Sequence, residues 1–242
     1  MRYTRLLFVA AATLLVSGMT MAQISLSPYI GFTSFGLKGA TTATTGGQIQ
    51  QIGVADAGKT GFNVGAGIGS RLLKIPGGVY ELDGVFDVSY ASAGLFEAGY
   101  NNVGGAGSFA AQGLSGATTT NLAFDLMPVH RFHIPGFSLL SPYAGLGLGL
   151  NYFSTSNLTV GPPSSNPSVS VNGTSQFKIG LLIFYGATLE ILPVIHPFLQ
   201  FKHYIPFGSQ FQFTDDAQRG TLIINDSRGY FNLTAGVQFS LK

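Results

Sequence analysis

The chain contains no cysteine. It can therefore form no disulfide bond and carry no lipid on an N-terminal cysteine, so an exported form must be held together by other means. Charged residues are also scarce: they make up 9% of the chain, whereas the surface of a soluble domain carries about 25–35%. Because hydrophobic residues make up 45%, the composition argues against a disordered chain as well as against an ordinary soluble domain.

Long hydrophobic runs are missing beyond the N-terminal segment. The longest one, "IGLLIFYGATL" at 179–189, is followed by Glu190 and then by Pro193. It is well short of the roughly 20 residues that a membrane-spanning helix needs. A helical membrane protein is therefore not expected. A membrane β-barrel remains, because its strands distribute apolar residues in alternation with polar ones.

The N-terminus has the layout of a secretory signal peptide. Arg2 and Arg5 precede an apolar run, and small residues lead up to Ala22. We predict a signal peptide at 1–22 and one β-barrel domain at 23–242; the alternative is a buried N-terminal helix. Cleavage removes two of the 12 basic residues, leaving 10 against 10 acidic ones. The net charge of +2 therefore gives no reason to expect a nucleic-acid partner.

Eight segments of the remaining chain alternate between apolar and polar residues, as β-strands with two different faces do. In "YELDGVFDVSY" at 80–90, for example, Tyr80 and Phe86 lie on one face, whereas Glu81 and Asp87 lie on the other. The segments lie at 24–35, 60–72, 80–90, 120–129, 142–153, 175–190, 197–207 and 229–242. All of them share one apolar parity. A closed sheet in lipid requires this, because no strand edge can stay unpaired there.

Connections between these segments alternate in length. The long ones lie at about 36–59, 91–118, 154–174 and 208–227, and the short ones at 74–78, 130–140 and 191–196. Outer-membrane barrels have long extracellular loops and short periplasmic turns. In its signal peptide, alternation, loop asymmetry and a last strand ending near Phe239, the chain resembles the small outer-membrane barrels of the OmpA/OmpX type over essentially all of 23–242.

The resemblance implies an all-β fold, an antiparallel up-and-down transmembrane barrel of eight strands in a bacterial outer membrane, without a periplasmic domain. Two alternatives stay open. The barrel has ten strands if the stretches near 157–160 and at 167–171 form another hairpin in the membrane. A secreted soluble barrel of the lipocalin type would instead have an apolar interior and a charged exterior, which the inward acids and scarce charge argue against.

The polar parity places charged residues in the barrel lumen. An eight-stranded barrel is just wide enough for side chains to fill, and buried charges are tolerated when they pair and hydrogen-bond. We predict a lumen network of Arg71, Glu81, Asp83, Asp87, Asp125, Lys178, Glu190 and Lys202. Inward glycines leave room for long side chains to cross. The alternative is that some of the carboxylates meet only trapped water.

Within this network, the hairpin at 74–78 is expected to place Arg71 directly opposite Glu81, with Asp83 one diagonal step away on the same face. The two lysines of the network are expected to cross from the far wall to its aspartates. The resulting plug of ion pairs predicts a barrel that does not conduct as an open pore.

No other motif predicts a cofactor, a metal or a catalytic site. The glycines of "GAGIG" (65–69) and "GLGLG" (145–149) recur with period two, which lines a strand face and does not form the turn of a nucleotide-binding loop. His130, His133 and His196 fall in the predicted short turns without a convergent set of ligands. The long connections contain no histidine, so no nucleophile and base are brought together.

We therefore expect a non-enzymatic outer-membrane protein with a structural or surface-interaction role, carried by four long extracellular loops. The expected partners are the outer-membrane lipid and an extracellular ligand or surface partner, and the expected state is a monomer. The alternative function is a narrow channel or carrier for small or hydrophobic solutes.

Overall fold

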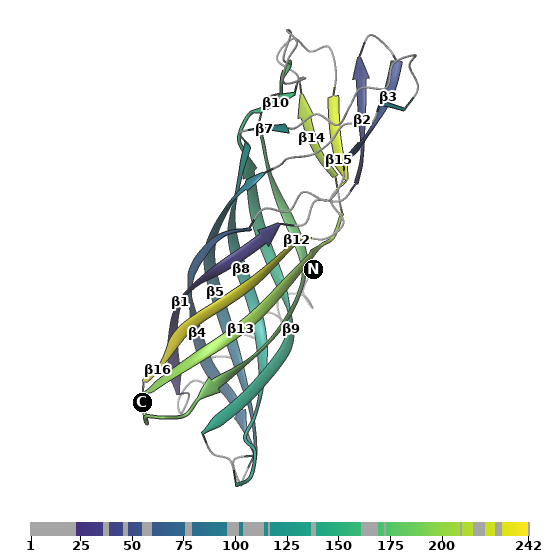
Figure 1. Ribbon diagram of the computed structural model, residues 1–242. Coiled ribbons are helices and arrows are strands. Elements are labelled where there is room, and N and C mark those ends of the chain that lie inside the picture. Colours follow the sequence, from purple (N-terminus) through teal and green to yellow (C-terminus); the bar gives the residue numbers. More distant parts are fainter. Residues whose placement is uncertain are drawn as a thin grey trace, which may run out of the picture.

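The computed structural model describes most of the chain from Gln23 to Leu241 (Figure 1). Outside the described residues lie 1–22, 36–38, 46–47, 55–59, 76–78, 96–101, 104–113, 116, 137–138, 161–168, 172, 209, 215–220, 226–228 and 242. The predicted signal peptide falls there and stays a prediction. No helix in the described part of the chain is long and apolar enough to cross a membrane.

Eight antiparallel strands close into one barrel (Figure 1). They are β1 (Ile24–Phe35), β4 (Thr60–Lys74), β5 (Tyr80–Leu95), β8 (Ala117–Phe132), β9 (Leu140–Thr155), β12 (Thr174–Leu189), β13 (Ile195–Pro206) and β16 (Tyr230–Leu241). The order around the barrel is β1-β16-β13-β12-β9-β8-β5-β4. The last strand pairs with the first from Ile24–Leu241 to Phe35–Tyr230, so the barrel has no free edge. The predicted up-and-down barrel of eight strands is confirmed.

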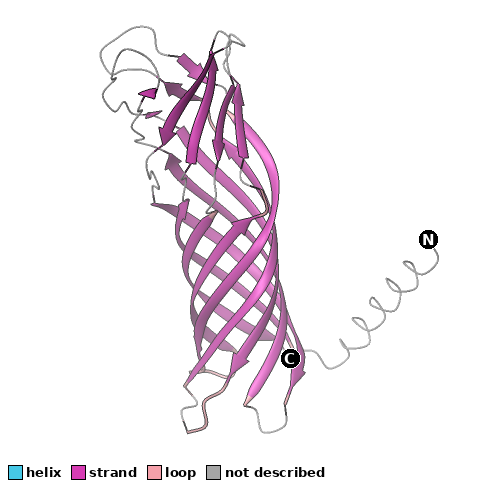
Figure 2. Ribbon diagram, turned by 90° about the vertical axis from the view of Figure 1, so that its right-hand side faces the viewer, coloured by secondary structure: helices cyan, strands magenta, loops and turns pink. Residues whose placement is uncertain are grey.

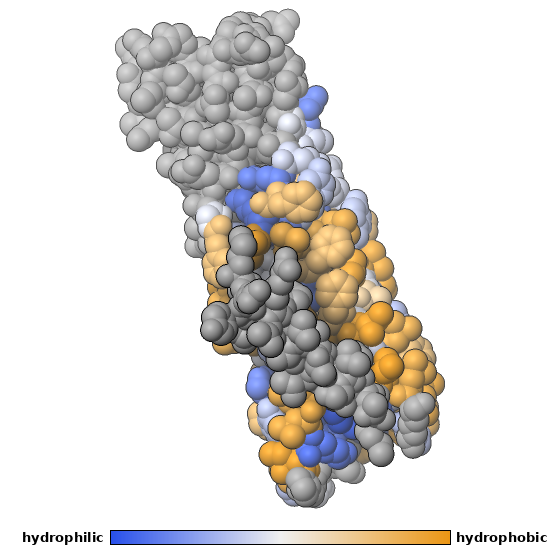
Figure 3. Space-filling model, turned by 180° about the vertical axis from the view of Figure 1, so that it is seen from behind, coloured by the Kyte–Doolittle hydropathy of each residue, from blue (hydrophilic) through white to orange (hydrophobic). Residues whose placement is uncertain are grey.

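Apolar side chains face outward from the barrel, and the polar parity faces the lumen. In β1, Ile30 and Phe32 are 69% and 65% exposed, whereas Thr33 is 0% exposed. Figure 3 shows hydrophobic side chains over much of the described outer surface. Because successive side chains of a strand point to opposite faces, the alternation in the sequence becomes this division between outside and lumen. A lipocalin-type barrel would have the opposite arrangement, so that alternative is wrong.

The long connections contain further β-structure beyond one end of the barrel (Figures 1 and 2). One sheet has the order β14-β15-β2-β3-β6 and consists of β14 (Gln210–Thr214), β15 (Thr221–Asn225), β2 (Gly39–Thr45), β3 (Gln48–Val54) and β6 (Asn102–Val103). The other has the order β11-β10-β7 and consists of β11 (Val169–Val171), β10 (Leu158–Val160) and β7 (Leu114–Ser115).

The second small sheet decides the number of barrel strands. β10 and β11 form a hairpin in the region that the ten-strand alternative requires, but they pair with each other and with β7. They are not part of the closed barrel. The ten-strand alternative is therefore wrong.

The two ends of the barrel differ in their connections. We call the end with the turns at 75–79, 133–139 and 190–194 the short-turn end, and the opposite end the long-connection end. Because outer-membrane barrels have short periplasmic turns and long extracellular loops, we expect the short-turn end on the periplasmic side.

Two strands extend further toward the short-turn end than the alternation predicts. β8 ends at Phe132, and β13 begins at Ile195. His130 and His196 are therefore strand residues, and their prediction as turn residues is wrong. The ladder continues here because backbone groups still find partners: the amide of His133 donates to the carbonyl oxygen of Val79 at 2.9 Å.

Candidate functional site in the barrel lumen

The charged residues at the short-turn end form one connected network in the lumen, which we call the lower network. Glu81 is 2% exposed, and its carboxylate lies 2.6 Å from Arg71 Nη2 and 2.8 Å from Lys74 Nζ. Asp83 lies 3.6 Å from Arg71 Nε and 3.5 Å from Arg131 Nη2. The two carboxylates thus share three cations, which offsets the cost of removing them from bulk water.

The register beneath the lower network differs from the prediction. Arg71 stands opposite Asp83 in the same register as Ser70 opposite Gly84, and a β-bulge between Arg71 and Leu73 brings Lys74 opposite Glu81. A bulge adds one residue to one strand and shifts the pairing beyond it. The prediction that Arg71 lies directly opposite Glu81 is therefore wrong in register, although the two side chains meet diagonally on the same barrel face.

Arg131 belongs to the lower network, and the sequence-based set omits it. It is 7% exposed, and its guanidinium donates to Thr188 Oγ1 at 2.7 Å and to Gln238 Oε1 at 3.0 Å. A third neighbour is Glu190, at 3.9 Å. Arg131 has the inward parity of Asp125, so extending the alternation of β8 by one more pair of residues would have found it.

The lower network lines an open vestibule of about 430 Å³ at the short-turn end. Two histidines complete its wall, each beside a carboxylate. His196 Nδ1 lies 2.9 Å from Glu190 Oε2, and His133 Nε2 lies 3.5 Å from Glu81 Oε2. A polar cavity of this size holds water, so the lower network is solvated on one side.

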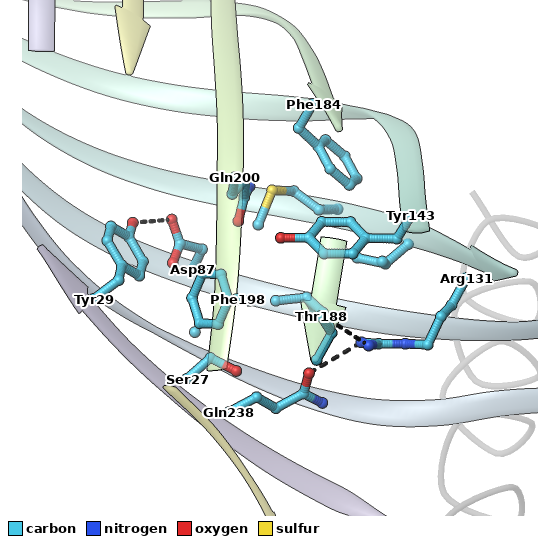
Figure 4. A pocket seen from close by; sticks show the side chains of 14 residues that line it. Ser27, Tyr29, Asp87, Arg131, Tyr143, Phe184, Thr188, Phe198, Gln200 and Gln238 are labelled. Atoms are coloured by element: carbon cyan, nitrogen blue, oxygen red, sulfur yellow. Dashed lines mark hydrogen bonds between the residues drawn. The ribbon is translucent and has the colours of Figure 1, made fainter. Parts of the chain in front are cut away.

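A smaller cavity of about 50 Å³ lies deeper in the lumen (Figure 4). Arg131 and Gln238 line both this cavity and the vestibule, so their hydrogen bond lies at the boundary between the two. Tyr143 and Phe184 fill another part of the wall, and Asp87 reaches it from β5. At this volume the cavity can hold only a few water molecules.

Lys202 is the centre of a second charged cluster, which we call the central cluster. Its ammonium donates to Asp87 Oδ2 at 2.6 Å and to Asp125 Oδ2 at 2.8 Å, and the Tyr29 hydroxyl donates to Asp87 Oδ2 at 2.7 Å. The three charged side chains are at most 2% exposed. An inward glycine makes room for this arrangement, since a Cβ on Gly65 would lie 2.5 Å from the Tyr29 hydroxyl.

Aromatic side chains fill the lumen between the central cluster and the long-connection end. The rings of Tyr204 and Tyr230 stack with centroids 5.1 Å apart. Phe153 packs against both, and Phe35 packs edge-on against Phe153 and Tyr230. These four residues, which we call the aromatic layer, are at most 4% exposed. The layer closes the lumen above the central cluster.

Lys178 is also buried in the lumen, at 7% exposed. It is near the start of β12, at the long-connection end, where its ammonium donates to the carbonyl oxygen of Gly208 at 3.3 Å. Arg71, Arg131 and Lys202 lie within ion-pair distance of the lumen aspartates. That Lys178 reaches these aspartates stays a prediction. Lys202 meets two of them.

The described part of the chain contains no group of three or more His, Asp or Glu side chains that could hold a metal ion. The two glycine-rich runs lie inside β4 and β9. They line strand faces and so lack the strand-to-helix turn that binds a nucleotide phosphate.

These features define the class of the protein. A closed barrel with an apolar outer face and a polar lumen is the form in which strands cross a lipid bilayer. The protein is an integral β-barrel of a bacterial outer membrane, with the architecture of the small eight-stranded barrels.

Solved structures of outer-membrane barrels are similar to this chain. A major outer membrane protein from Thermus thermophilus is 14% identical, with 91% of this chain and 100% of that chain covered and a TM-score of 0.51. Neisserial surface protein A is 15% identical, with 91% and 97% covered and a TM-score of 0.44. The outer membrane protease OmpT from Escherichia coli is 11% identical, with 90% and 97% covered and a TM-score of 0.45. No protein-family model and no curated protein matches the chain.

Proposed function

We propose that this protein is a non-conducting, non-enzymatic barrel that acts at the cell surface through the β-structure of its long connections. The observation that carries the proposal is the filling of the lumen. The central cluster and the aromatic layer lie between the vestibule and the long-connection end, and their residues are at most 4% exposed. A solute entering from the vestibule would have to displace a paired lysine and then four aromatic rings.

The long connections support a surface role. Their larger sheet includes two strands of 7 residues, β2 and β3, and two of 5 residues, β14 and β15. Recognition commonly resides in connections that a rigid scaffold presents, and the barrel is such a scaffold. Within the described residues, β14 and β6 are the edge strands of this sheet. Edge strands offer unpaired backbone groups to a partner.

One serine–histidine contact bears on the expectation that the protein is not an enzyme. Ser141 Oγ lies 2.9 Å from His133 Nδ1, and His133 Nε2 faces Glu81, which is the set of residue types found in hydrolytic triads. Ser141 is 1% exposed and does not line the vestibule. A nucleophile without access to a cavity cannot attack a substrate, so this contact is better explained as a structural hydrogen bond.

Conductance in planar lipid bilayers tests the proposal. Purified, refolded protein should give no steady current, because the central cluster and the aromatic layer fill the described part of the lumen. A steady current from the wild-type protein would contradict the proposal and favour the alternative of a narrow channel or carrier.

A second experiment tests the surface role. Cells that display the wild-type protein are compared with cells in which the β14–β15 hairpin is shortened to a tight turn, using binding to panels of surface proteins and glycans. Binding that the shortened variant loses while its barrel still folds is expected. Equal binding by both proteins to every panel would contradict a role for this sheet.

A further inference from the structure

The short turns carry unusually large apolar side chains. Each turn contains Ile or Leu followed by proline, at 75–76, 134–135 and 192–193. Large apolar residues in these turns are 45% to 60% exposed: Ile75, Val79, Ile134, Leu139, Ile191, Leu192 and Val194. We call these seven residues the apolar collar. Turns that end in water are usually built from Gly, Asn, Asp and Ser, so the collar indicates different surroundings.

On β4, the opposite rim of the barrel is polar at the position equivalent to Ile134. On β4, Thr60 stands two residues beyond the outward-facing Phe62. At the short-turn end, Ile134 stands two residues beyond the outward-facing Phe132. The two positions lie at equal sequence distance from the last outward aromatic residue of their strands, but one is a threonine and the other an isoleucine. At this pair of positions, the short-turn rim continues the apolar surface and the other rim does not.

The height of the apolar surface places the collar at the edge of the bilayer. Outward-facing residues of β8 run from Leu122 to Phe132, and 132 − 122 gives ten steps. Ten residues of a strand tilted by about 40° rise roughly 25 Å, which is the usual height of the apolar band. Ile134 lies about 5 Å further. In Figure 3, hydrophobic side chains continue to the lower end of the barrel, beside a hydrophilic area.

We propose that the apolar collar is inserted among the phospholipids of the inner leaflet and sets the depth of the barrel in the membrane. The collar is continuous with the lipid-facing surface through Phe132 and Leu73, which are 48% and 51% exposed. It is spread over three turns around a charged vestibule, whose mouth Ile191 and Leu192 also line, and it does not form one flat patch, which suits a fluid lipid better than a protein partner. Tilting of the barrel or local thickening of the bilayer accommodates the extra height.

The absence of tryptophan from the chain makes a single-reporter test straightforward. Ile134→Trp and Thr60→Trp are matched variants, because each residue lies two positions beyond an outward phenylalanine. Each variant is refolded into phosphatidylcholine vesicles whose acyl chains are brominated near the headgroup, and quenching of tryptophan emission is measured. Ile134→Trp should lose most of its emission and Thr60→Trp much less. Equal quenching of the two would overturn the proposal.

Acrylamide, a water-soluble quencher, shows whether the collar faces lipid, water or another protein. If Ile134→Trp is quenched by acrylamide and not by brominated lipid, the collar faces water, and the proposal fails. If neither quencher reaches it, a second copy of the chain or another protein covers the collar, and the proposal fails as well.

Removing the collar tests its control over depth. The variant Ile134→Ser/Leu139→Ser/Leu192→Ser is combined with a Phe132→Trp reporter, and heat-modifiable migration in detergent gels verifies that the barrel has folded. Relative to the reporter in the intact collar, quenching by the brominated lipid should fall as this rim moves toward water. Should quenching be unchanged in the folded variant, the collar does not set the depth.

Discussion

Replacing Lys202 by methionine tests whether the central cluster is dry. Asp87 and Asp125 would then stand opposite each other on β5 and β8 without the ammonium that lies 2.6 Å and 2.8 Å from their oxygens. Removing one partner of a buried ion pair costs about 3–5 kcal/mol. Because two carboxylates lose their cation together, we expect the unfolding free energy to fall by an amount at the upper end of that range.

Lys74 supplies a matched control for this prediction. Its ammonium also makes a close contact, 2.8 Å from Glu81, but its side chain is 52% exposed. Exposed ion pairs contribute about 0–1 kcal/mol, so Lys74→Met should change stability little. Both variants are measured by urea unfolding in lipid vesicles, followed by circular dichroism. Equal losses in the two variants would refute the view that the central cluster is sealed from water.

The same unfolding measurement checks three further predictions. Leu148 is 54% exposed on the lipid face, so Leu148→Arg should lose about 2–4 kcal/mol; no loss would contradict its outward direction. Arg131→Met should lose on the order of 3–5 kcal/mol, whereas Arg71→Met, whose side chain is 27% exposed toward the vestibule, should lose about 1 kcal/mol or less. The reverse order would contradict the solvated vestibule. Gly65→Val should lose about 1–3 kcal/mol by overpacking against Tyr29, unless that ring leaves the lumen.

The direction of the strand residues was predictable because it depends only on the period of the strand. Ile30 and Phe32 face outward and Thr33 inward, as their parity requires. Closure was predictable for the same reason, because eight strands in lipid leave two unpaired edges unless the last strand pairs with the first. The presence of both Asp87 and Lys202 in the lumen follows from parity alone. Their contact across the lumen needed the structure.

Positions along the barrel axis were less predictable than directions. Arg71 stands opposite Asp83, two residues from the predicted Glu81, and nothing in the alternation of 60–72 marks where the bulge after Arg71 falls. Lys178 was assigned to the right face, because its side chain is buried in the lumen. Parity gives a face, but height depends on strand stagger, which is set by the pairing of all the strands.

Arg131 shows a different limit. Polar residues next to a glycine and a proline favour a turn in a sequence read locally, and "HRFHIPG" has all of these features. The strand nevertheless continues to Phe132, because its neighbours on both sides supply ladder partners at this height. In the lumen, Arg131 then binds Thr188 and Gln238, which come from two other strands. No local pattern contains this information.

The lower network and the central cluster are made of the same residue types, but their surroundings give them different roles. Arg71 and Lys74 border a vestibule of about 430 Å³, so water can replace a lost partner there. Lys202 is 1% exposed and lies below the aromatic layer, so bulk water does not reach its ammonium. Solvent access therefore determines which ion pairs contribute to stability. The ion pairs of the central cluster should change little with ionic strength, whereas those of the lower network should rearrange easily while the lumen stays closed.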